Sequence, residues 1–177
     1  MTPRRSLLGA LKSLLTPSSR RPAAPAPTTP VPREEERSGF AATVGIAPPR
    51  ANDLRIAYQP DPDGDPDAGE IIWTWVPYAE RDGRGKDRPV LVIGRQDASR
   101  VYAVRLTSKA HDGDRDFLPI GSGPWDSQGR PSWVDIEQLY SVHVDGMRRE
   151  ASALDLDRFT RVAQALHRRY GWSVGNG

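Results

Sequence analysis

Basic side chains gather in two places in the second half of the sequence, beside polar groups that could take part in chemistry. The clusters are Arg81, Arg84, Lys86 and Arg88, and then Arg105, Thr107, Ser108 and Lys109. A fixed cation can hold a phosphate and stabilise the charge that develops when a phosphodiester bond is cleaved, while a hydroxyl can assist by hydrogen bonding. On residue types alone, a solvated loop and a β-branched strand residue remain the simpler interpretation. Phosphodiester chemistry is the alternative.

Several other chemistries are excluded by what the sequence lacks. It contains no cysteine, which removes disulfides, thiol catalysis and cysteine-bound zinc, and which is typical of a reducing cytosol. The acidic run at residues 61–67 resembles the start of a calcium loop, but Pro66 and Ile72 occupy the positions of the required glycine and bidentate carboxylate. The three histidines have no metal-binding spacing. We therefore expect no metal and no cofactor.

Composition divides the chain near Gly69. Of the 17 prolines, 12 precede Gly69, and this part is poor in large apolar residues. We therefore expect residues 1–68 to be a disordered, proline-rich extension and residues 69–177 to form one domain with the core. The formal net charge is only +2, so a nucleic-acid partner has to be argued from a local patch rather than from total charge.

The extension begins with a leucine-rich segment at residues 7–15 that has helical spacing and basic neighbours. Three interpretations stay open for it: a secretory signal, a basic amphipathic helix that binds an anionic membrane or a partner, or a short helix with no fixed role. A proline-rich linker follows at residues 17–32. Because no apolar run approaches about 18 residues, we expect no transmembrane segment.

From Gly69 the hydrophobic pattern changes to that of strands. Alternating or continuous apolar runs predict strands at residues 69–77, 90–93, 101–107, 117–120 and 133–144, the second buried on both faces and the last with one solvated face. The strand at 101–107 would place Thr107 on the same face as Arg105. A helix follows, capped by Asp155 and ended by Gly171. This order predicts a small, strongly bent antiparallel sheet or barrel with a C-terminal helix.

The sequence resembles the MazF/PemK family of toxin–antitoxin ribonucleases over about residues 69–172. Gly69–Trp73 matches the opening G-[DE]-[IV]-[IVL]-W of that family, and Arg88-Pro89 matches the start of its next strand. Thr107 matches the threonine that ends the following strand, and Glu137-Gln138-Leu139 resembles the family's Asp-Gln-Val segment. Each motif is weak alone, but their order and spacing together are specific.

The resemblance implies a small SH3-like barrel of the MazF/CcdB type that is cytoplasmic, forms a homodimer and is neutralised by a cognate antitoxin protein. It implies cleavage of single-stranded RNA (mRNA or rRNA) without a metal, through attack of the 2′-hydroxyl and a 2′,3′-cyclic phosphate. Carried over by position, Arg88 would stabilise the transition state and assist proton transfer, and Thr107 would hydrogen-bond the reacting phosphate or 2′-hydroxyl. The remaining candidates would bind RNA: Arg84, Lys86, Arg105, Ser108 and Lys109.

Two departures from the family pattern keep a second function open. Residues 82–84 read Asp-Gly-Arg where many family members carry a glutamate, and the loop at residues 109–116 is acidic for an RNA-binding edge. The alternative is a non-catalytic module on the same barrel that binds nucleic acid or protein, for example one that poisons a DNA-associated enzyme as CcdB-type toxins do.

Overall fold

The computed structural model describes residues 39–61, 63, 65–80 and 82–175. The leucine-rich segment, the proline-rich linker and Arg81 lie outside the described residues. The elements in chain order are β1 (Val44–Ile46), β2 (Arg55–Ile56), β3 (Glu70–Pro77), β4 (Gly85–Arg95), β5 (Arg100–Thr107), β6 (Phe117–Gly121), β7 (Ser132–His143), a 3-10 turn (Val144–Gly146), β8 (Met147–Ala153), α2 (Leu156–Tyr170) and β9 (Ser173–Val174).

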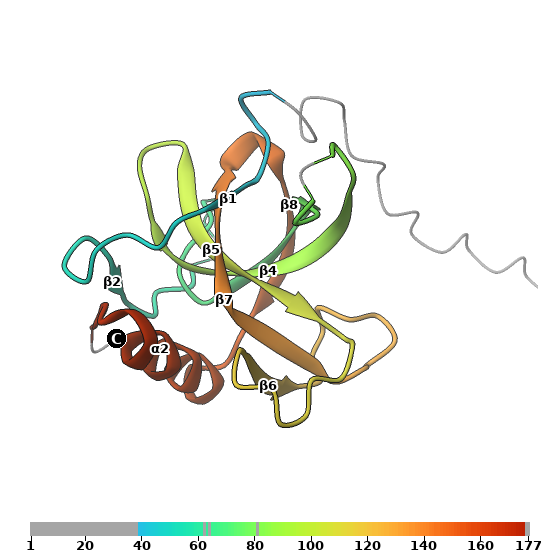
Figure 1. Ribbon diagram of the computed structural model, residues 1–177, viewed down its shortest axis with the longest axis vertical. Coiled ribbons are helices and arrows are strands. Elements are labelled where there is room, and N and C mark those ends of the chain that lie inside the picture. Colours follow the sequence, from blue (N-terminus) through green and yellow to red (C-terminus); the bar gives the residue numbers. More distant parts are fainter. Residues whose placement is uncertain (1–38, 62, 64, 81, 176–177) are drawn as a thin grey trace, which may run out of the picture. The chain divides into compact units, whose positions relative to one another are not determined.

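Seven of the strands form one bent sheet in the order β1-β7-β5-β4-β3-β8, with β6 also paired to β7 (Figure 1). All of these pairings are antiparallel, whereas the short strands β2 and β9 pair in parallel. The expected fold class, a mainly antiparallel β protein with a C-terminal helix, is confirmed. The sequence pattern did not indicate β1, β2, β8 or β9.

Apolar side chains are buried on both faces of the sheet. The larger cluster joins alternate residues of β3, β4 and β5, such as Ile71, Leu91 and Leu106, to the inner stripe of α2. The smaller cluster joins the intervening residues, such as Val90 and Tyr140. Residues 90–93 of β4 are fully inaccessible to solvent, so the expected burial of this strand on both faces is confirmed.

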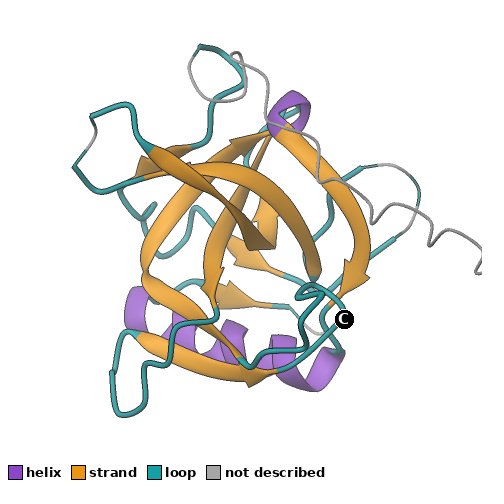
Figure 2. Cartoon of the chain, turned by 90° about the vertical axis from the view of Figure 1, so that its right-hand side faces the viewer, coloured by secondary structure: helices purple, strands orange, loops and turns teal. Residues whose placement is uncertain are grey.

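The helix α2 closes one side of the sheet (Figure 2) and follows from local sequence signals. A carboxylate oxygen of Asp155 accepts a hydrogen bond from the backbone N–H of Arg158 and caps the helix. At the other end Gly171 adopts a left-handed conformation with φ of 77°, which glycine reaches without strain. The apolar stripe of the helix packs on the larger cluster.

The expectation of a solvated face on the last long strand is wrong. All but three residues of β7 are buried, because its side chains pack into both apolar clusters, Leu139 into the larger and Tyr140 into the smaller. Its polar residues are satisfied internally: Arg105 binds Asp135, and Arg100 donates to the hydroxyl of Ser141. The sequence pattern records the polarity of these side chains but not the arginines that reach them.

The packed structure begins before Gly69, where the composition places the start of the domain. Ala41, Leu54 and Ile56 are buried, and β1 pairs with β7 along residues 139–141. The described residues that precede Gly69 therefore add the strand β1 to the main sheet and side chains to its hydrophobic core. This contribution matters for the site, because β1 lies beside one of its clefts.

Candidate functional site

Arg88 lies between two clefts and lines both of them. The first has a volume of about 260 Å³ and is named here the Thr107 cleft. The second has a volume of about 640 Å³ and is named the Tyr140 cleft. Arg88 stands on β4, so the central strand of the sheet carries the residue that the two clefts share.

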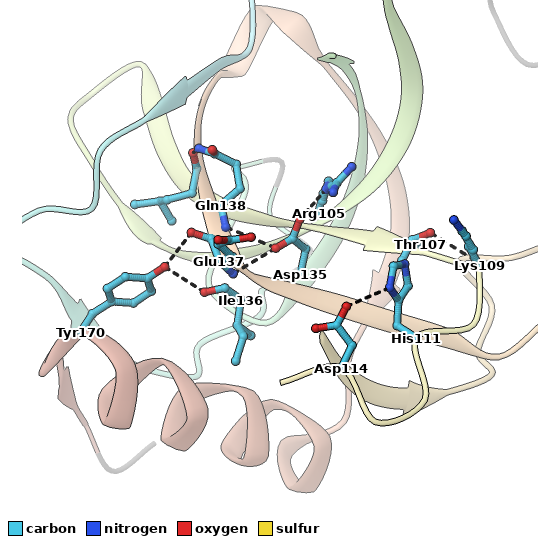
Figure 3. A network of polar contacts seen from close by, with 11 residues as sticks. Arg105, Thr107, Lys109, His111, Asp114, Asp135, Ile136, Glu137, Gln138 and Tyr170 are labelled. Atoms are coloured by element: carbon cyan, nitrogen blue, oxygen red, sulfur yellow. Dashed lines mark hydrogen bonds and ion pairs between the residues drawn. The ribbon is translucent and has the colours of Figure 1, made fainter. Parts of the chain in front are cut away.

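The Thr107 cleft brings together four of the residues singled out in the sequence beside Arg88. Lys86 comes from β4, and Thr107, Ser108 and Lys109 come from the end of β5 and the residues after it. The backbone N–H of Lys109 donates to Oγ1 of Thr107 at 3.2 Å, as Figure 3 shows. The predicted residues thus contribute two lysines, an arginine and two hydroxyls to one small cleft, which Asp87, Asp126 and Arg130 also line.

Arg105 lines the Tyr140 cleft and is held by a buried carboxylate. Its Nε donates to Oδ2 of Asp135 at 2.7 Å, and Oδ1 of Asp135 accepts the backbone N–H groups of Glu137 and Gln138 at 3.0 and 3.2 Å (Figure 3). Asp135 is 3% exposed. Arg105 is therefore fixed by its partner and largely neutralised by it.

Arg88 has no such partner. Among the residues that the structure describes, none forms a hydrogen bond or an ion pair with its guanidinium group. Burial of the side chain lowers the pKa of Arg88, and repulsion from Arg105 lowers it further, while Tyr78 and Tyr140 act in the opposite direction. A half-buried cation beside a second cation is electrostatically suited to receive an anion.

Tyr140 contributes a neutral hydroxyl to this neighbourhood. Burial raises the pKa of the Tyr140 phenol, partly offset by Arg105 and Arg88. The phenol therefore keeps its proton at neutral pH and can donate a hydrogen bond. Tyr140 lies in the smaller apolar cluster and lines the cleft that bears its name.

Arg84 lies outside both clefts. Its Nε donates to Oδ2 of Asp82 at 2.6 Å, and 69% of its side chain is exposed. The Asp-Gly-Arg departure noted in the sequence thus pairs an acidic and a basic residue within the loop between β3 and β4. This pairing reduces the positive charge that Arg84 presents to a ligand.

The sequence analysis missed several residues that line the clefts. Trp73, Trp125 and Arg130 line the Thr107 cleft, and Tyr78 and Tyr140 line the Tyr140 cleft. Trp125 and Arg130 come from the loop between β6 and β7. The sequence of this long polar loop does not indicate that it lies beside the cleft. Tyr140 could have been found, because strand alternation predicts it on one face with Val142.

Neither a metal centre nor a membrane span emerges from the described part of the chain. Within it, no group of three or more histidine, aspartate and glutamate side chains is placed to hold a metal ion. No helix in the same residues is long and apolar enough to cross a membrane.

Solved structures that resemble this chain include an endoribonuclease and MazF toxins. An endoribonuclease in complex with its cognate antitoxin from a mycobacterial species is 17% identical, with 60% of this chain and 96% of that chain covered and a TM-score of 0.47. The toxin MazF-mt6 of Mycobacterium tuberculosis is 17% identical, with 59% and 98% covered and a TM-score of 0.44. MazF in the MazE–MazF complex of Deinococcus radiodurans is 22% identical, with 61% and 97% covered and a TM-score of 0.47.

Because these TM-scores lie below 0.5, we assign the family from the sequence match alone. No curated protein sequence matches the chain. Residues 67–169, more than half of the chain, match the family described as PemK-like, MazF-like toxin of type II toxin-antitoxin system. The matched range contains both basic clusters and all of β3 to β8. The chain therefore belongs to the PemK-like and MazF-like toxins of type II toxin–antitoxin systems.

Proposed function

We propose that the protein is an endoribonuclease that cleaves single-stranded RNA without a metal ion and that the reaction takes place at Arg88 and Thr107. The observation that supports this most directly is the unpartnered guanidinium of Arg88 at the junction of two clefts. A phosphodiester placed there would supply the counter-charge that Arg88 receives from no described residue. The family assignment agrees with this chemistry.

The proposed reaction is an internal transfer of the phosphodiester bond. The 2′-oxygen of one ribose forms a bond to the adjacent phosphorus and loses its proton, and the bond from phosphorus to the 5′-oxygen of the next nucleotide breaks. The 5′-oxygen leaves with a proton, so the products are a 2′,3′-cyclic phosphate and a 5′-hydroxyl. Arg88 would stabilise the extra negative charge on the phosphorane and assist the proton transfer.

The remaining cations would hold the RNA backbone. Lys86 and Lys109 line the Thr107 cleft together with Ser108, so they would bind phosphates on that side of Arg88. Arg105 lines the other cleft, and its pairing with Asp135 would limit it to a positioning role. Thr107 would hydrogen-bond the reacting phosphate or the 2′-hydroxyl. Arg84, which is paired with Asp82, would contribute least.

The experiment is an assay of the purified full chain on mixed single-stranded RNA in the presence of EDTA, with the chemistry of the new ends determined. We expect the wild type to produce 5′-hydroxyl ends, and we expect Arg88→Ala to lower the cleavage rate by about 10²–10⁴-fold. Arg95→Ala is the matched control, because Arg95 ends the same strand and lines neither cleft. Full activity in Arg88→Ala would remove Arg88 from the mechanism.

The partners follow from the same proposal. We propose a cytoplasmic homodimer whose reacting residues lie within residues 69–177 and which is neutralised by a separately encoded antitoxin. A toxin assay in cells distinguishes this from a non-catalytic binding module: growth inhibition that persists in Arg88→Ala, without new 5′-hydroxyl RNA ends, would favour the binding module.

A further inference from the structure

The strand β1 forms part of the wall of the Tyr140 cleft, although it precedes the residues that match the family. Gly45 lies opposite Tyr140 in the register of β1 and β7, and both residues line the cleft. A Cβ atom at Gly45 would lie 3.2 Å from Nε2 of Gln138 and 3.9 Å from Cε1 of Tyr140. A side chain at position 45 would therefore project towards these two residues and narrow the cleft.

Side-chain hydrogen bonds fix the segment that leads into β1. The guanidinium of Arg100 donates to the backbone carbonyls of Phe40 at 2.6 Å and Ala42 at 3.3 Å. Thr74 donates its hydroxyl proton to the carbonyl of Gly146 at 2.9 Å, so the 2.7 Å contact between Thr43 and Thr74 has Thr43 as its donor. The wall that β1 provides is thus anchored at two buried or half-buried points.

Gln138 faces this cleft in one defined orientation. Its side-chain Nε2 donates to the backbone carbonyls of Ile46 at 3.3 Å and Leu139 at 2.7 Å. Two carbonyl partners fix the amino side of the amide, so Oε1 remains as an acceptor. No hydrogen bond from another described residue reaches this oxygen. The carboxylate of Glu137 lines the same cleft and is exposed.

We propose that the Tyr140 cleft holds the nucleobase that flanks the phosphate at Arg88, and that Gln138 is the residue that selects this base. This inference rests on the proposed function, because it takes single-stranded RNA as the ligand. Single-stranded RNA is read by unstacked bases that lie against aromatic side chains and hydrogen-bond to polar ones. Tyr78, which is partly exposed, supplies an aromatic surface, and Tyr140, which is 5% exposed, adds a small part of the lining. Arg88 joins this cleft to the site of reaction.

The acceptors in the cleft specify a class of base. Oε1 of Gln138 and the carboxylate of Glu137 both accept hydrogen bonds, so they favour a base with an exocyclic amino group. The amino group of adenine, cytosine or guanine has two hydrogens and can donate to both acceptors, whereas uracil offers only its N3–H and can satisfy one of them. We expect the wild type to cleave substrates with one of these three bases at the flanking position about 3–10-fold faster than the uracil substrate, the effect of one hydrogen bond.

The first test fills the cleft from β1. Gly45→Leu should lower kcat/KM at least 10-fold on oligonucleotides with a base at the flanking position, and less than 3-fold when that position is abasic. Val44→Leu is the matched control, because Val44 is exposed on the other face of the same strand. An equal loss on both substrates, or no loss on either, would overturn the inference.

The second test does not depend on the stability of the Gly45 variant. Gln138→Met removes the acceptor at similar length, so the ratio of kcat/KM between the amino-bearing bases and uracil should fall to about one. A ratio that stays at its wild-type value would show that Gln138 does not select the base. Thermal unfolding of each variant separates these effects from loss of the fold.

A binding arm separates failure of this inference from failure of the proposed function. A single-stranded oligonucleotide with 2′-deoxyribose at the cleavage position cannot react but presents the same bases. Cleavage by the wild type with no effect of Gly45→Leu overturns the inference alone. Absence of cleavage overturns the proposed function. In that case Gly45→Leu should still weaken binding of the base-bearing oligonucleotide more than binding of its abasic counterpart. An equal effect of the substitution on both oligonucleotides would overturn the inference as well.

Discussion

Arg88 and Arg105 are two guanidinium groups at one cleft that differ in whether a carboxylate neutralises them. Arg105 donates to Asp135 at 2.7 Å, whereas no described residue forms an ion pair with Arg88. Burial of the side chain lowers the pKa of Arg88, and the positive charge of Arg105 lowers it further. The protein holds this arrangement in place through the strand pairing of β4 with β5.

The unpartnered cation leads to a prediction about stability. Because the folded state lowers the pKa of Arg88, charged Arg88 is less favourable when folded than when unfolded, and it is charged at all pH values up to that lowered pKa. Arg88→Gln should therefore raise the free energy of unfolding at neutral pH. Inorganic phosphate should stabilise the wild type by about 1.4 kcal/mol at ten times its dissociation constant, and should not stabilise Arg88→Gln.

Denaturant titrations with and without phosphate measure both effects. Arg95→Gln is the control, since it removes a cation from the end of the same strand and should keep the response to phosphate. Equal phosphate stabilisation of Arg88→Gln and the wild type would place the anion elsewhere.

The pair of Arg105 and Asp135 should contribute to stability rather than to turnover alone. Asp135→Ala would leave Arg105 beside Arg88 without a counter-charge and two backbone N–H groups without their acceptor. We expect a loss of about 2–3 kcal/mol in the free energy of unfolding, measured by urea titration. Glu137→Ala, at an exposed neighbour, should change stability by less than about 0.5 kcal/mol. A similar small change for Asp135→Ala would contradict this prediction.

The hydroxyl of Thr107 should matter more than the shape of its side chain. Thr107→Val keeps the shape and removes the hydroxyl, so we expect kcat/KM to fall by about 10²-fold, while Thr107→Ser should stay within about 5-fold of the wild type. Thr160→Val, on α2 and outside both clefts, is the control. Equal kinetics for the valine and serine variants would show that the hydroxyl takes no part.

The salt dependence of RNA binding should distinguish Lys86 and Lys109, which we expect to contact the RNA backbone, from Arg84, which we expect to contribute least. For single-stranded RNA, each phosphate contact adds about 0.7 to the slope of log K against log salt concentration. Lys86→Ala and Lys109→Ala should each reduce the slope by about this amount, because both lysines line the Thr107 cleft. Arg84→Ala should change it less, since Asp82 already pairs with Arg84. Fluorescence anisotropy with an uncleavable oligonucleotide gives the slopes.

The segment that carries β1 should loosen when its anchor is removed. Arg100→Met deletes the hydrogen bonds to the carbonyls of Phe40 and Ala42, so the backbone amides of residues 41–46 should exchange their hydrogens faster than in the wild type. Exchange in α2 should be unchanged in the same sample. Unaltered exchange at residues 41–46 would mean that strand pairing with β7 suffices to hold the segment.

The sequence predicted the parts of the structure that local signals determine. The cap at Asp155 and the stop at Gly171 gave the helix, and alternation gave β3, β5 and β6, because each of these signals lies within a few residues. The family resemblance placed Arg88 at the start of one strand and Thr107 at the end of the next, and the structure brings both residues to one cleft.

What escaped prediction depends on residues far apart in the chain. Three residues of β1 carry no periodicity, and their strand exists only because β7 offers an edge. The polar side chains of β7 suggested a face exposed to solvent. In the structure, Arg105 and Arg100, which are 30 and 41 residues away in the chain, donate hydrogen bonds to Asp135 and Ser141. The Tyr140 cleft combines both effects, so its wall could not be predicted from any single segment.

The pairing of β1 with β7 also has a consequence for synthesis of the chain. The partners are more than ninety residues apart, since Val44 pairs with Ser141 and the Gln138 side chain bonds to Ile46. During translation, residues 39–46 leave the ribosome long before the strand on which they dock. The Tyr140 cleft is therefore completed late on a nascent chain. A ribosome-bound precursor that lacks β7 contains Arg88 but not the side of the cleft that Gln138 and Tyr140 provide.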